Sequence, residues 1–411
     1  MTHGSLFILI IAIIVFGYLF DLWLGYLNTT TWSSVLPGSL KGIYDNEKYS
    51  EQQKFERTRY RFKLVSGAFS FLLMIGMLSI DGFAILDNFL RQYTSSPIVL
   101  ALLFFGTIGF LSDLLSTPFD IYDTFIIEQR FGFNNTTALT YLLDKLKGWL
   151  LAVIIGGGLL SLIVWVYEKT GSSFWLVTWG IITFFSLVAN YFYTIIILPL
   201  FNKLTPLPDG ELKDEIGAFV QKVGFKLSSV YVIDGSKRST RGNAYFSGFG
   251  RQKKIVLYDT LIAEHSVQEL VAILAHEIGH YKRKHILKGM ISSVIQTGLL
   301  LLILSYFIGN PALSLALGSE FPSFHLALIT FAILYSPISI VFGLGQNYLS
   351  RKHEYEADEF AATFYNAEAL QLALKKLSIK NLSNLTPHPW YVFVNYSHPT
   401  LLNRLDALDK A

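Results

Sequence analysis

Seven apolar stretches, each long enough to cross a lipid bilayer, constrain the fold of this chain more than any other feature of its sequence. About 20 apolar residues in a helix span the roughly 30 Å hydrocarbon core of a membrane. Only 15% of the residues are charged, whereas about 25% is typical of soluble globular chains. We therefore predict an α-helical polytopic membrane protein, with spans near residues 5–26, 64–86, 97–117, 149–167, 174–200, 287–308 and 322–348.

Basic residues are distributed unevenly between the loops that join these spans. The N-terminus and the loops 87–96, 168–173 and 309–321 contain only Arg91 and Lys169 of the 33 Lys and Arg residues. In membrane proteins the cytoplasmic loops carry the excess of basic residues. The N-terminus is therefore predicted to lie outside, with the long loops and the C-terminus in the cytoplasm.

Two long hydrophilic regions lie on the predicted cytoplasmic side, before span six and after span seven. Together they are long enough to form one small soluble domain assembled across two spans. Residues 1–200 are expected to contain spans one to five with the cytoplasmic loops 27–63 and 118–148. The first part of the domain is expected in 201–286 and the second part in 349–411, with spans six and seven between them in 287–348.

Local patterns predict an α+β fold for this domain. Ser266 and Glu269 form a capping-box pattern, and the apolar residues that follow recur at helical spacing, which predicts a helix over Ser266–His285. Short apolar or alternating runs predict a small antiparallel sheet. Its strands are expected at Ser229–Ile233, Asn243–Phe249 and Lys254–Tyr258.

The absence of cysteine and the small net charge exclude several kinds of function. Without Cys the chain has no disulfide, no thiolate nucleophile and no Cys-ligated metal, so a metal site must use His, Asp or Glu. A net charge of +3 is a slight excess, not the clustered basic face of a nucleic-acid-binding protein. We expect the lipid bilayer as a partner and no nucleic acid.

One motif in the soluble domain predicts metal chemistry. His276-Glu277-Ile278-Gly279-His280 places two histidines four residues apart on the predicted helix. Both imidazoles can then reach one metal ion, with Glu277 beside them as general base. Zinc suits such a set, because it takes imidazole and carboxylate ligands and keeps one position open in catalytic sites. The motif predicts one Zn²⁺ per chain, and the alternative is a chance match on a surface helix.

A third protein ligand is needed, and Glu354 is the best candidate. His285 stands at the wrong spacing for the third histidine of the metzincin pattern. Glu354 and Asp358 are four residues apart and share one face of a helix. Glu354 can therefore bind the metal while Asp358 accepts a hydrogen bond from a ligand imidazole. The alternative is a solvated acidic face that pairs with neighbouring basic residues.

The order of these motifs resembles that of the type-I CAAX prenyl endopeptidases, the seven-span membrane zinc proteases that process the yeast a-factor pheromone and prelamin A. The H-E-x-x-H sequence is followed by E-Y-x-A-D at residues 354–358, as in that family. The resemblance covers nearly the whole chain. Further matching stretches are Phe125-Ile126-Ile127-Glu128 with Gly132-Phe133-Asn134, Phe201-Asn202-Lys203 with Thr205-Pro206-Leu207-Pro208, Arg238-Ser239 with Asn243-Ala244-Tyr245-Phe246, and Ser397-His398-Pro399 with Arg404-Leu405.

The resemblance implies a role for each matching position of the metal site. It implies that His276, His280 and Glu354 are the zinc ligands of a gluzincin-type domain and that Glu277 is the base. Asn243-Ala244-Tyr245 resembles the strand that receives the substrate as an added β-strand, a mode in which main-chain hydrogen bonds tolerate many sequences.

The C-terminal motif is implied to complete the site. His398 is similar to the histidine that stabilises the oxyanion, and Arg404 to a nearby supporting cation. From the residues alone, a helix-capping histidine beside Pro399 and a surface salt-bridge arginine are the better interpretations. The sequence departs from the resemblance at Arg241, where many relatives have histidine, and the effect of this change on substrate choice stays open.

The predicted function is therefore zinc-dependent endopeptidase activity on membrane-associated peptides or proteins, of the CAAX prenyl-protein kind or in membrane-protein quality control. The alternatives are a polytopic transporter and a non-catalytic membrane holdase. Neither alternative explains both the ordered motifs and the intact base. The compact chain and its short outward loops favour a bacterial member of the family in the inner membrane, with the endoplasmic reticulum (ER) membrane as the alternative.

Overall fold

The computed structural model of the chain describes residues 3–247 and 254–410. Within these residues, seven helical segments are long and apolar enough to cross a membrane, one for each predicted span. Three of them pass through a short π-helical turn, at Asp123–Glu128, Ala152–Gly156 and Tyr193–Ile197. The spans are α1 (His3–Thr29), α2 (Asn46–Ser79), α4 (Pro97–Tyr122), α5 with α6 (Ala138–Leu151, Gly157–Thr170), α7 with α8 (Phe174–Phe192, Leu198–Phe201), α12 (His285–Phe307) and α14 (Phe324–Phe364).

Several of these helices differ from the boundaries predicted from hydropathy, among them α2, α14 and the fourth span, which begins at Ala138 and not at residue 149. α2 begins at Asn46, where the Asp45 carboxylate accepts a hydrogen bond from the Lys48 backbone N–H (2.7 Å), and α14 continues to Phe364. The predicted second span reaches residue 86, but α2 ends at Ser79. Asp81 has a left-handed conformation (φ 53°) and precedes a separate helix, α3 (Gly82–Arg91). Apolar composition continues across this turn, so hydropathy does not reveal it.

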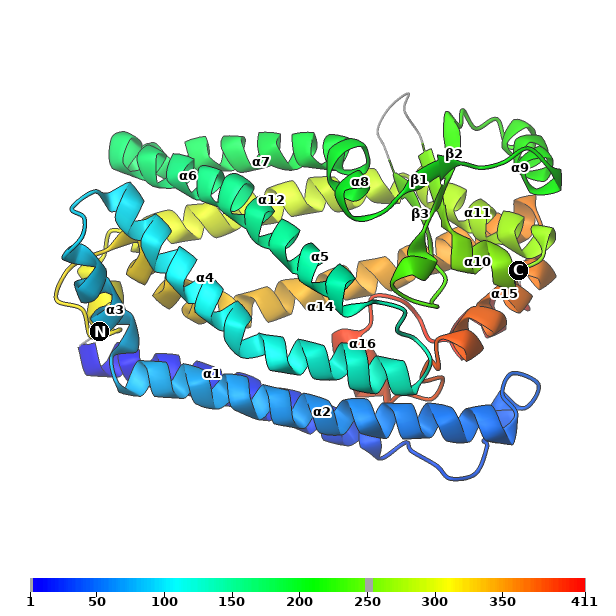
Figure 1. The fold of residues 1–411 in the computed structure, drawn as a ribbon, viewed down its shortest axis with the longest axis horizontal. Helices are drawn as coiled ribbons and strands as arrows, with labels where there is room; N and C mark the ends of the chain where they lie inside the picture. The colour runs from blue at the N-terminus through cyan, green and yellow to red at the C-terminus, as the bar shows by residue number, and fades with distance from the viewer. Residues whose placement is uncertain (1–2, 248–253, 411) are drawn as a thin grey trace.

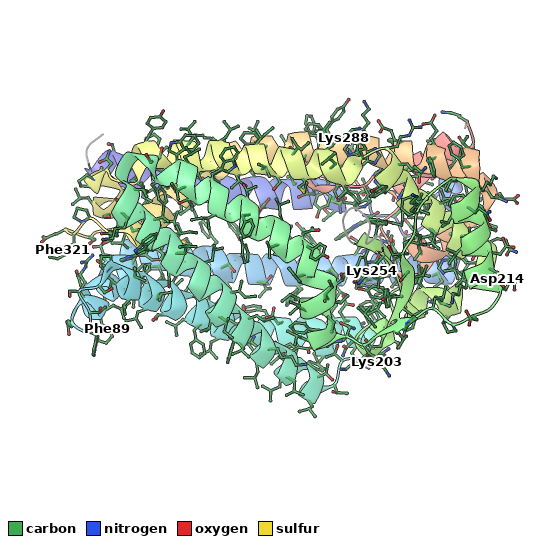
Figure 2. All side chains as sticks on the ribbon, turned by 90° about the horizontal axis from the view of Figure 1, so that it is seen from above. Phe89, Lys203, Asp214, Lys254, Lys288 and Phe321 are labelled. Carbon is green, nitrogen blue, oxygen red and sulfur yellow. The ribbon has the colours of Figure 1, made fainter. Side chains whose placement is uncertain are left out.

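The soluble elements gather at one end of an elongated molecule, as Figure 1 shows. The membrane helices lie along its long axis, and the sheet is at that end together with α9 (Glu211–Lys222) and α15 (Ala367–Lys380). The opposite end carries α3 and α13 (Pro311–Leu315). In Figure 2, Phe89 of α3 and Phe321 lie at that opposite end, far from Asp214 of α9.

The sheet has four strands in the order β1-β2-β4-β3. β1 (Leu204–Pro206) adds to the three predicted strands, which are β2 (Ser229–Ile233), β3 (Ala244–Ser247) and β4 (Lys254–Tyr258). The predicted antiparallel sheet is wrong in one respect, because β2 and β4 are parallel. The chain leaving β2 passes the position of β4 and enters the sheet at its edge as β3, which then pairs antiparallel with β4. Gly248 and Phe249 of the predicted strand lie outside the described residues.

One hydrophobic core joins the chain before span six to the chain after span seven. Ile255 and Leu257 of β4 pack with Leu274 of α11 (Val267–Lys282) and with Ala361 at the end of α14. α10 (Asp259–Glu264), α15 and α17 (Leu401–Leu408) supply further residues of this core. Because α14 runs unbroken from the membrane into this core, it fixes the soluble elements to the spans.

The helix predicted over Ser266–His285 ends early. α11 stops at Lys282, Lys284 adopts a left-handed conformation (φ 60°), and α12 begins at His285. The capping box predicted at its start is present. The metal motif and span six are therefore separate helices joined by a tight turn, which brings His285 back toward the motif.

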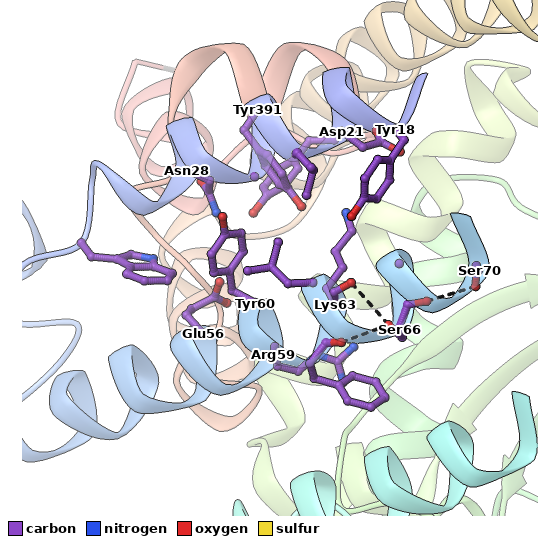
Figure 3. A pocket seen from close by; sticks show the side chains of 17 residues that line it. Tyr18, Asp21, Asn28, Glu56, Arg59, Tyr60, Lys63, Ser66, Ser70 and Tyr391 are labelled. Atoms are coloured by element: carbon purple, nitrogen blue, oxygen red, sulfur yellow. Dashed lines mark hydrogen bonds between the residues drawn. The ribbon is translucent and has the colours of Figure 1, made fainter. Parts of the chain in front are cut away.

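A second feature of the span region is a cavity of about 620 Å³ between α1, α2 and α16 (Pro389–Asn395). Asn28, Glu56 and Lys63 are among the side chains that line it (Figure 3). Among the described residues it shares no lining residue with the cleft that contains His276 and His280.

Candidate metal centre

Helix α11 presents the metal motif from a fixed position. At its start, the Ser266 hydroxyl and the Glu269 carboxylate accept hydrogen bonds from each other's backbone N–H groups, at 3.3 and 3.0 Å. Lys376 of α15 pairs with the same carboxylate at 2.8 Å. Most of α11 is buried between the sheet and the other helices. The helix therefore holds His276 and His280, one turn apart, on one rigid face.

Helix α14 approaches α11 closely because the residues at their contact have small side chains or none. A Cβ added to Gly279 would lie 3.1 Å from the Phe360 Cβ and 3.2 Å from the Ala357 Cα, closer than side-chain atoms normally pack. Ala357 and Ala361 are fully buried at this contact. The close approach brings the side chains of Glu354 and Asp358 to the two histidines.

Three ligand atoms converge at the point where these helices meet. His276 Nε2 and His280 Nε2 are 3.1 Å apart, and the Glu354 carboxylate oxygens lie 3.5 Å and 3.2 Å from them, respectively. Atoms bound at 2.0–2.1 Å to a tetrahedral zinc ion stand about 3.3 Å apart. Within the part of the chain that the structure describes, this is the one group of three such residues close enough to hold a metal.

The hydrogen bonds behind the two histidines explain why a cation fits here. His276 Nδ1 donates to Asp358 Oδ1 at 2.8 Å, which leaves the lone pair on Nε2. His285 Nε2 donates to Glu356 Oε2 at 2.8 Å, so His285 Nδ1 accepts from His280 Nδ1 at 3.0 Å. In this arrangement both Nε2 lone pairs and a carboxylate face one point. These groups repel one another unless a cation lies between them, and the donor set fits Zn²⁺.

His285 and Glu356 are the site residues that the sequence analysis missed. His285 is 5% exposed, and its ring stacks on that of His353 with centroids 4.0 Å apart. The spacing of His285 excludes it only as the third metal ligand of a metzincin and predicts no other role for it. The available signal was a histidine just past the motif together with a glutamate two residues after Glu354. Only the turn between α11 and α12 brings the two together.

Arg404 from α17 joins the centre from a third helix. It donates to both oxygens of Asp358, from Nη2 at 2.6 Å and from Nε at 2.8 Å, and its Nη1 lies 3.4 Å from a Glu354 oxygen. Burial disfavours its charge, but the ion pair with Asp358 more than compensates, and the pKa of Arg404 is raised. Arg404 therefore holds Asp358 as a charged acceptor for His276.

His398 and Glu277 lie at the edges of the same centre. His398 Nε2 is 3.4 Å from a Glu354 oxygen, its Nδ1 is 2.9 Å from the Ser397 hydroxyl, and 63% of its side chain is exposed. The imidazole is thus anchored at one nitrogen and accessible at the other. Glu277 lines the cleft, and burial raises the pKa of its carboxyl.

The open edge of the sheet forms one wall of the cleft. The cleft has a volume of about 350 Å³ and is lined by Asn243 and Ala244 together with the metal-centre residues. Within residues 3–247 and 254–410, β3 is the last strand on this side of the sheet, and the chain at its start lines the cleft. The Tyr245 side chain points elsewhere and packs against Tyr258 and the cluster around Val256.

Comparison with known proteins agrees with this geometry along the whole chain. Residues 25–203 match the family "CAAX prenyl protease N-terminal, five membrane helices", and residues 206–411 match "Peptidase family M48". The chain is 35% identical to CAAX prenyl protease 1 of Saccharomyces cerevisiae over 404 residues, which cover 91% of this chain and 88% of the relative. This chain belongs to the CAAX prenyl protease 1 family of M48 peptidases.

Further members of the CAAX prenyl protease 1 family show how complete the match is. The CAAX prenyl protease 1 homolog of Arabidopsis thaliana is 32% identical over 97% of this chain and 96% of its own length. The crystal structure of S. mikatae Ste24p superposes with a TM-score of 0.93 at 31% identity, over 98% of this chain and 99% of that chain. The chain is therefore an integral, multi-pass membrane zinc metalloendopeptidase, and its family sets aside the transporter interpretation.

Proposed function

We propose that this peptidase holds one Zn²⁺ through His276, His280 and Glu354 and cleaves peptide bonds of membrane-anchored proteins of the CAAX type. The convergence of two imidazole lone pairs with one buried carboxylate carries the proposal. A zinc ion in this position supplies a Lewis acid that polarises a carbonyl group and makes water acidic. The names of the relatives, CAAX prenyl protease 1 and its homolog, support the substrate class.

The side chains around the ligands have distinct proposed roles. Glu277 is the general base, which receives a proton from the attacking water and returns it to the leaving amine. His398 donates a hydrogen bond to the negative charge that develops on the scissile carbonyl oxygen, a contribution of roughly 2.7–4 kcal/mol for comparable donors. Asp358 orients His276, and Arg404 keeps Asp358 ionised.

The edge strand is proposed to bind the substrate main chain. An extended peptide laid along Asn243-Ala244-Tyr245 pairs with the free edge of β3 and passes the metal ligands, because all of these line or border one cleft. Main-chain pairing accepts many sequences, so specificity must come from elsewhere in the cleft. Membrane attachment of the substrate is one such source, since span six begins five residues after His280.

The placement in a membrane is also a proposal. The uneven distribution of basic residues supports an outside N-terminus and cytoplasmic soluble elements. The relatives named above come from yeasts and a plant, and these organisms favour the ER membrane over the bacterial inner membrane. The shared core supports the division in which 201–286 and 349–411 form one domain across the spans in 287–348.

One experiment tests the activity and the substrate class together. Protein solubilised in detergent is incubated with a farnesylated CAAX peptide and with the same peptide unmodified. The proposal expects faster cleavage of the farnesylated peptide and loss of all cleavage with 1,10-phenanthroline. Equal rates would remove the prenyl requirement, and cleavage that survives the chelator would contradict the metal mechanism. Tight binding of denatured membrane proteins without cleavage would favour the holdase alternative.

His285→Ala is expected to weaken zinc binding about 10- to 100-fold, the usual effect of removing an outer partner of a metal-bound histidine. Without His285, His280 Nδ1 loses its hydrogen-bond partner and the imidazole is free to turn. Competition with a fluorescent chelator measures the affinity independently of peptidase activity. His285→Asn should restore part of it, because its amide oxygen can accept the same hydrogen bond. His388→Ala, at the start of α16, is the control; unchanged affinity in His285→Ala would refute the role.

A further inference from the structure

A second cavity continues the active-site cleft beyond the start of β3. It has a volume of about 750 Å³, and Gly242, Leu261 and Leu377 line both it and the cleft. Its other walls come from the start of α2, the loop 130–133, α10 and the end of α15. We call this second cavity the tail pocket. Because Gly242, Leu261 and Leu377 line both spaces, the two cavities are adjacent, and a peptide that continues past these residues from the cleft would enter the tail pocket.

The direction of a bound peptide decides which of its ends reaches the tail pocket. Antiparallel pairing is the commoner and slightly more stable arrangement of neighbouring strands, and β3 already pairs in this way with β4. A peptide antiparallel to β3 has its N-terminal part beside the end of β3 and its C-terminal part beside Gly242. The residues after the scissile bond therefore point into the tail pocket.

Four basic residues line the tail pocket, together with the carboxylates of Glu51 and Glu264. Lys48, Lys376 and Lys380 line it, but each is paired with a carboxylate, at 2.8, 2.8 and 2.7 Å. Arg130 also lines it, and within residues 3–247 and 254–410 its guanidinium has no carboxylate partner. Its guanidinium carbon lies over the Phe131 ring, 5.7 Å from the ring centroid. One cation in the tail pocket is thus free to bind an anion.

The backbone next to Arg130 is fixed relative to the edge strand. The Thr240 hydroxyl donates to the Gly132 carbonyl at 2.8 Å, and the Thr240 N–H donates to the Phe133 carbonyl at 3.0 Å. Asn134 and Ser239 form a β-bridge. Gly132 has φ +74°, a conformation that favours glycine and lets the loop turn here. The backbone at Arg130 therefore keeps a constant place relative to β3, and its exposed side chain extends from there.

We propose that the tail pocket binds the C-terminal tail of the substrate, with its free α-carboxylate paired to Arg130. This inference rests on the proposed function. A CAAX protein ends three residues after its prenylated cysteine, and three extended residues reach about 10 Å. Cleavage after that cysteine places the tail and its carboxylate on the side of the tail pocket. An arginine suits this role, since its planar group can bind a carboxylate through two hydrogen bonds.

The test compares two farnesylated peptides that differ only at the C-terminus, one a free acid and one an amide. In the wild-type protein, kcat/KM for the acid should exceed that for the amide by roughly three- to tenfold, as expected for one partly exposed charge-assisted pair. Arg130→Ala should bring this ratio close to one, and Arg130→Glu should invert it. Arg61→Ala is the control, because Arg61 is exposed but does not line the tail pocket.

Each outcome separates this inference from the proposed function. Equal cleavage of acid and amide by the wild-type protein, sensitive to the chelator, would overturn the carboxylate site and leave the peptidase proposal standing. A preference for the acid that survives Arg130→Glu would overturn the role of Arg130. Failure of the wild-type protein to cleave either peptide would count against the proposed function and this inference together.

Discussion

Glu277→Gln is expected to abolish measurable peptide hydrolysis while the protein keeps its zinc. The substitution preserves the shape of the side chain and removes its ability to take a proton. General acid–base catalysis contributes typically 10²–10⁴-fold, so initial rates should fall by at least this factor. Glu277 lines the cleft without being one of the three converging ligands, so metal content should stay near one zinc per chain. Rates on a farnesylated peptide and elemental analysis of the same sample provide both readings.

The matched control for this prediction is Glu211→Gln, the same substitution on the exposed first turn of α9. It should leave both activity and zinc content unchanged. If Glu277→Gln turns over at a rate near that of the control, another group is the base. If it loses zinc as well as activity, Glu277 supports the metal and the loss of rate says nothing about proton transfer.

The sequence predicted those features that follow from local spacing. The seven spans are found because apolar length alone identifies a membrane helix. His276 and His280 come together because residues four apart share a helix face. The Ser266 cap is equally local. The motif at residues 354–358 predicted that Glu354 joins the two histidines although it is remote from them in sequence. The structure places a carboxylate oxygen of Glu354 within 3.5 Å of each imidazole.

The features that were missed depend on how the chain turns between elements. The parallel pairing of β2 with β4 depends on the path of the chain between these strands, which passes through β3 at the edge of the sheet. Alternation of apolar and polar residues reveals only which face of the sheet a side chain lies on. The break at Lys284 cannot be read from hydropathy, because basic residues are common both inside helices and at their ends. That break places His285 against His280. Arg130 is likewise remote in sequence from the segment before β3, Ser239 and Thr240, that its loop contacts.

The structure also explains why the metal site needs both helices to be intact. The proposed ligands come from α11 and α14, and their outer partners come from α12, α14 and α17. Each ligand histidine donates to a different partner, Asp358 for His276 and His285 for His280. Rotation of either imidazole would break a hydrogen bond in a largely buried environment, which costs about 1–3 kcal/mol. The ligand geometry is therefore set before a metal binds.

Glu354→Gln is expected to produce a folded protein that no longer retains zinc during purification. The amide fits the same space but replaces a charged ligand with a neutral one, between two imidazoles and beside Arg404. Loss of a direct ligand should weaken binding by more than the roughly 10–100-fold caused by losing an outer partner. Elemental analysis and chelator competition measure this loss, and thermal unfolding in the presence of EDTA tests the fold of the metal-free protein.

Glu359→Gln is the control for this change, because Glu359 lies on the same helix and is 59% exposed in a pair with Arg283. It should keep wild-type zinc affinity. If Glu354→Gln retains one zinc per chain with the affinity of this control, Glu354 is not a ligand, and the two imidazoles must share their cation with another group. If Glu354→Gln instead loses zinc but unfolds in EDTA at the same temperature as the wild-type protein, Glu354 is a ligand. The fold should be unchanged because the packing of α14 against α11 depends on Gly279 and Ala357 and not on the carboxylate.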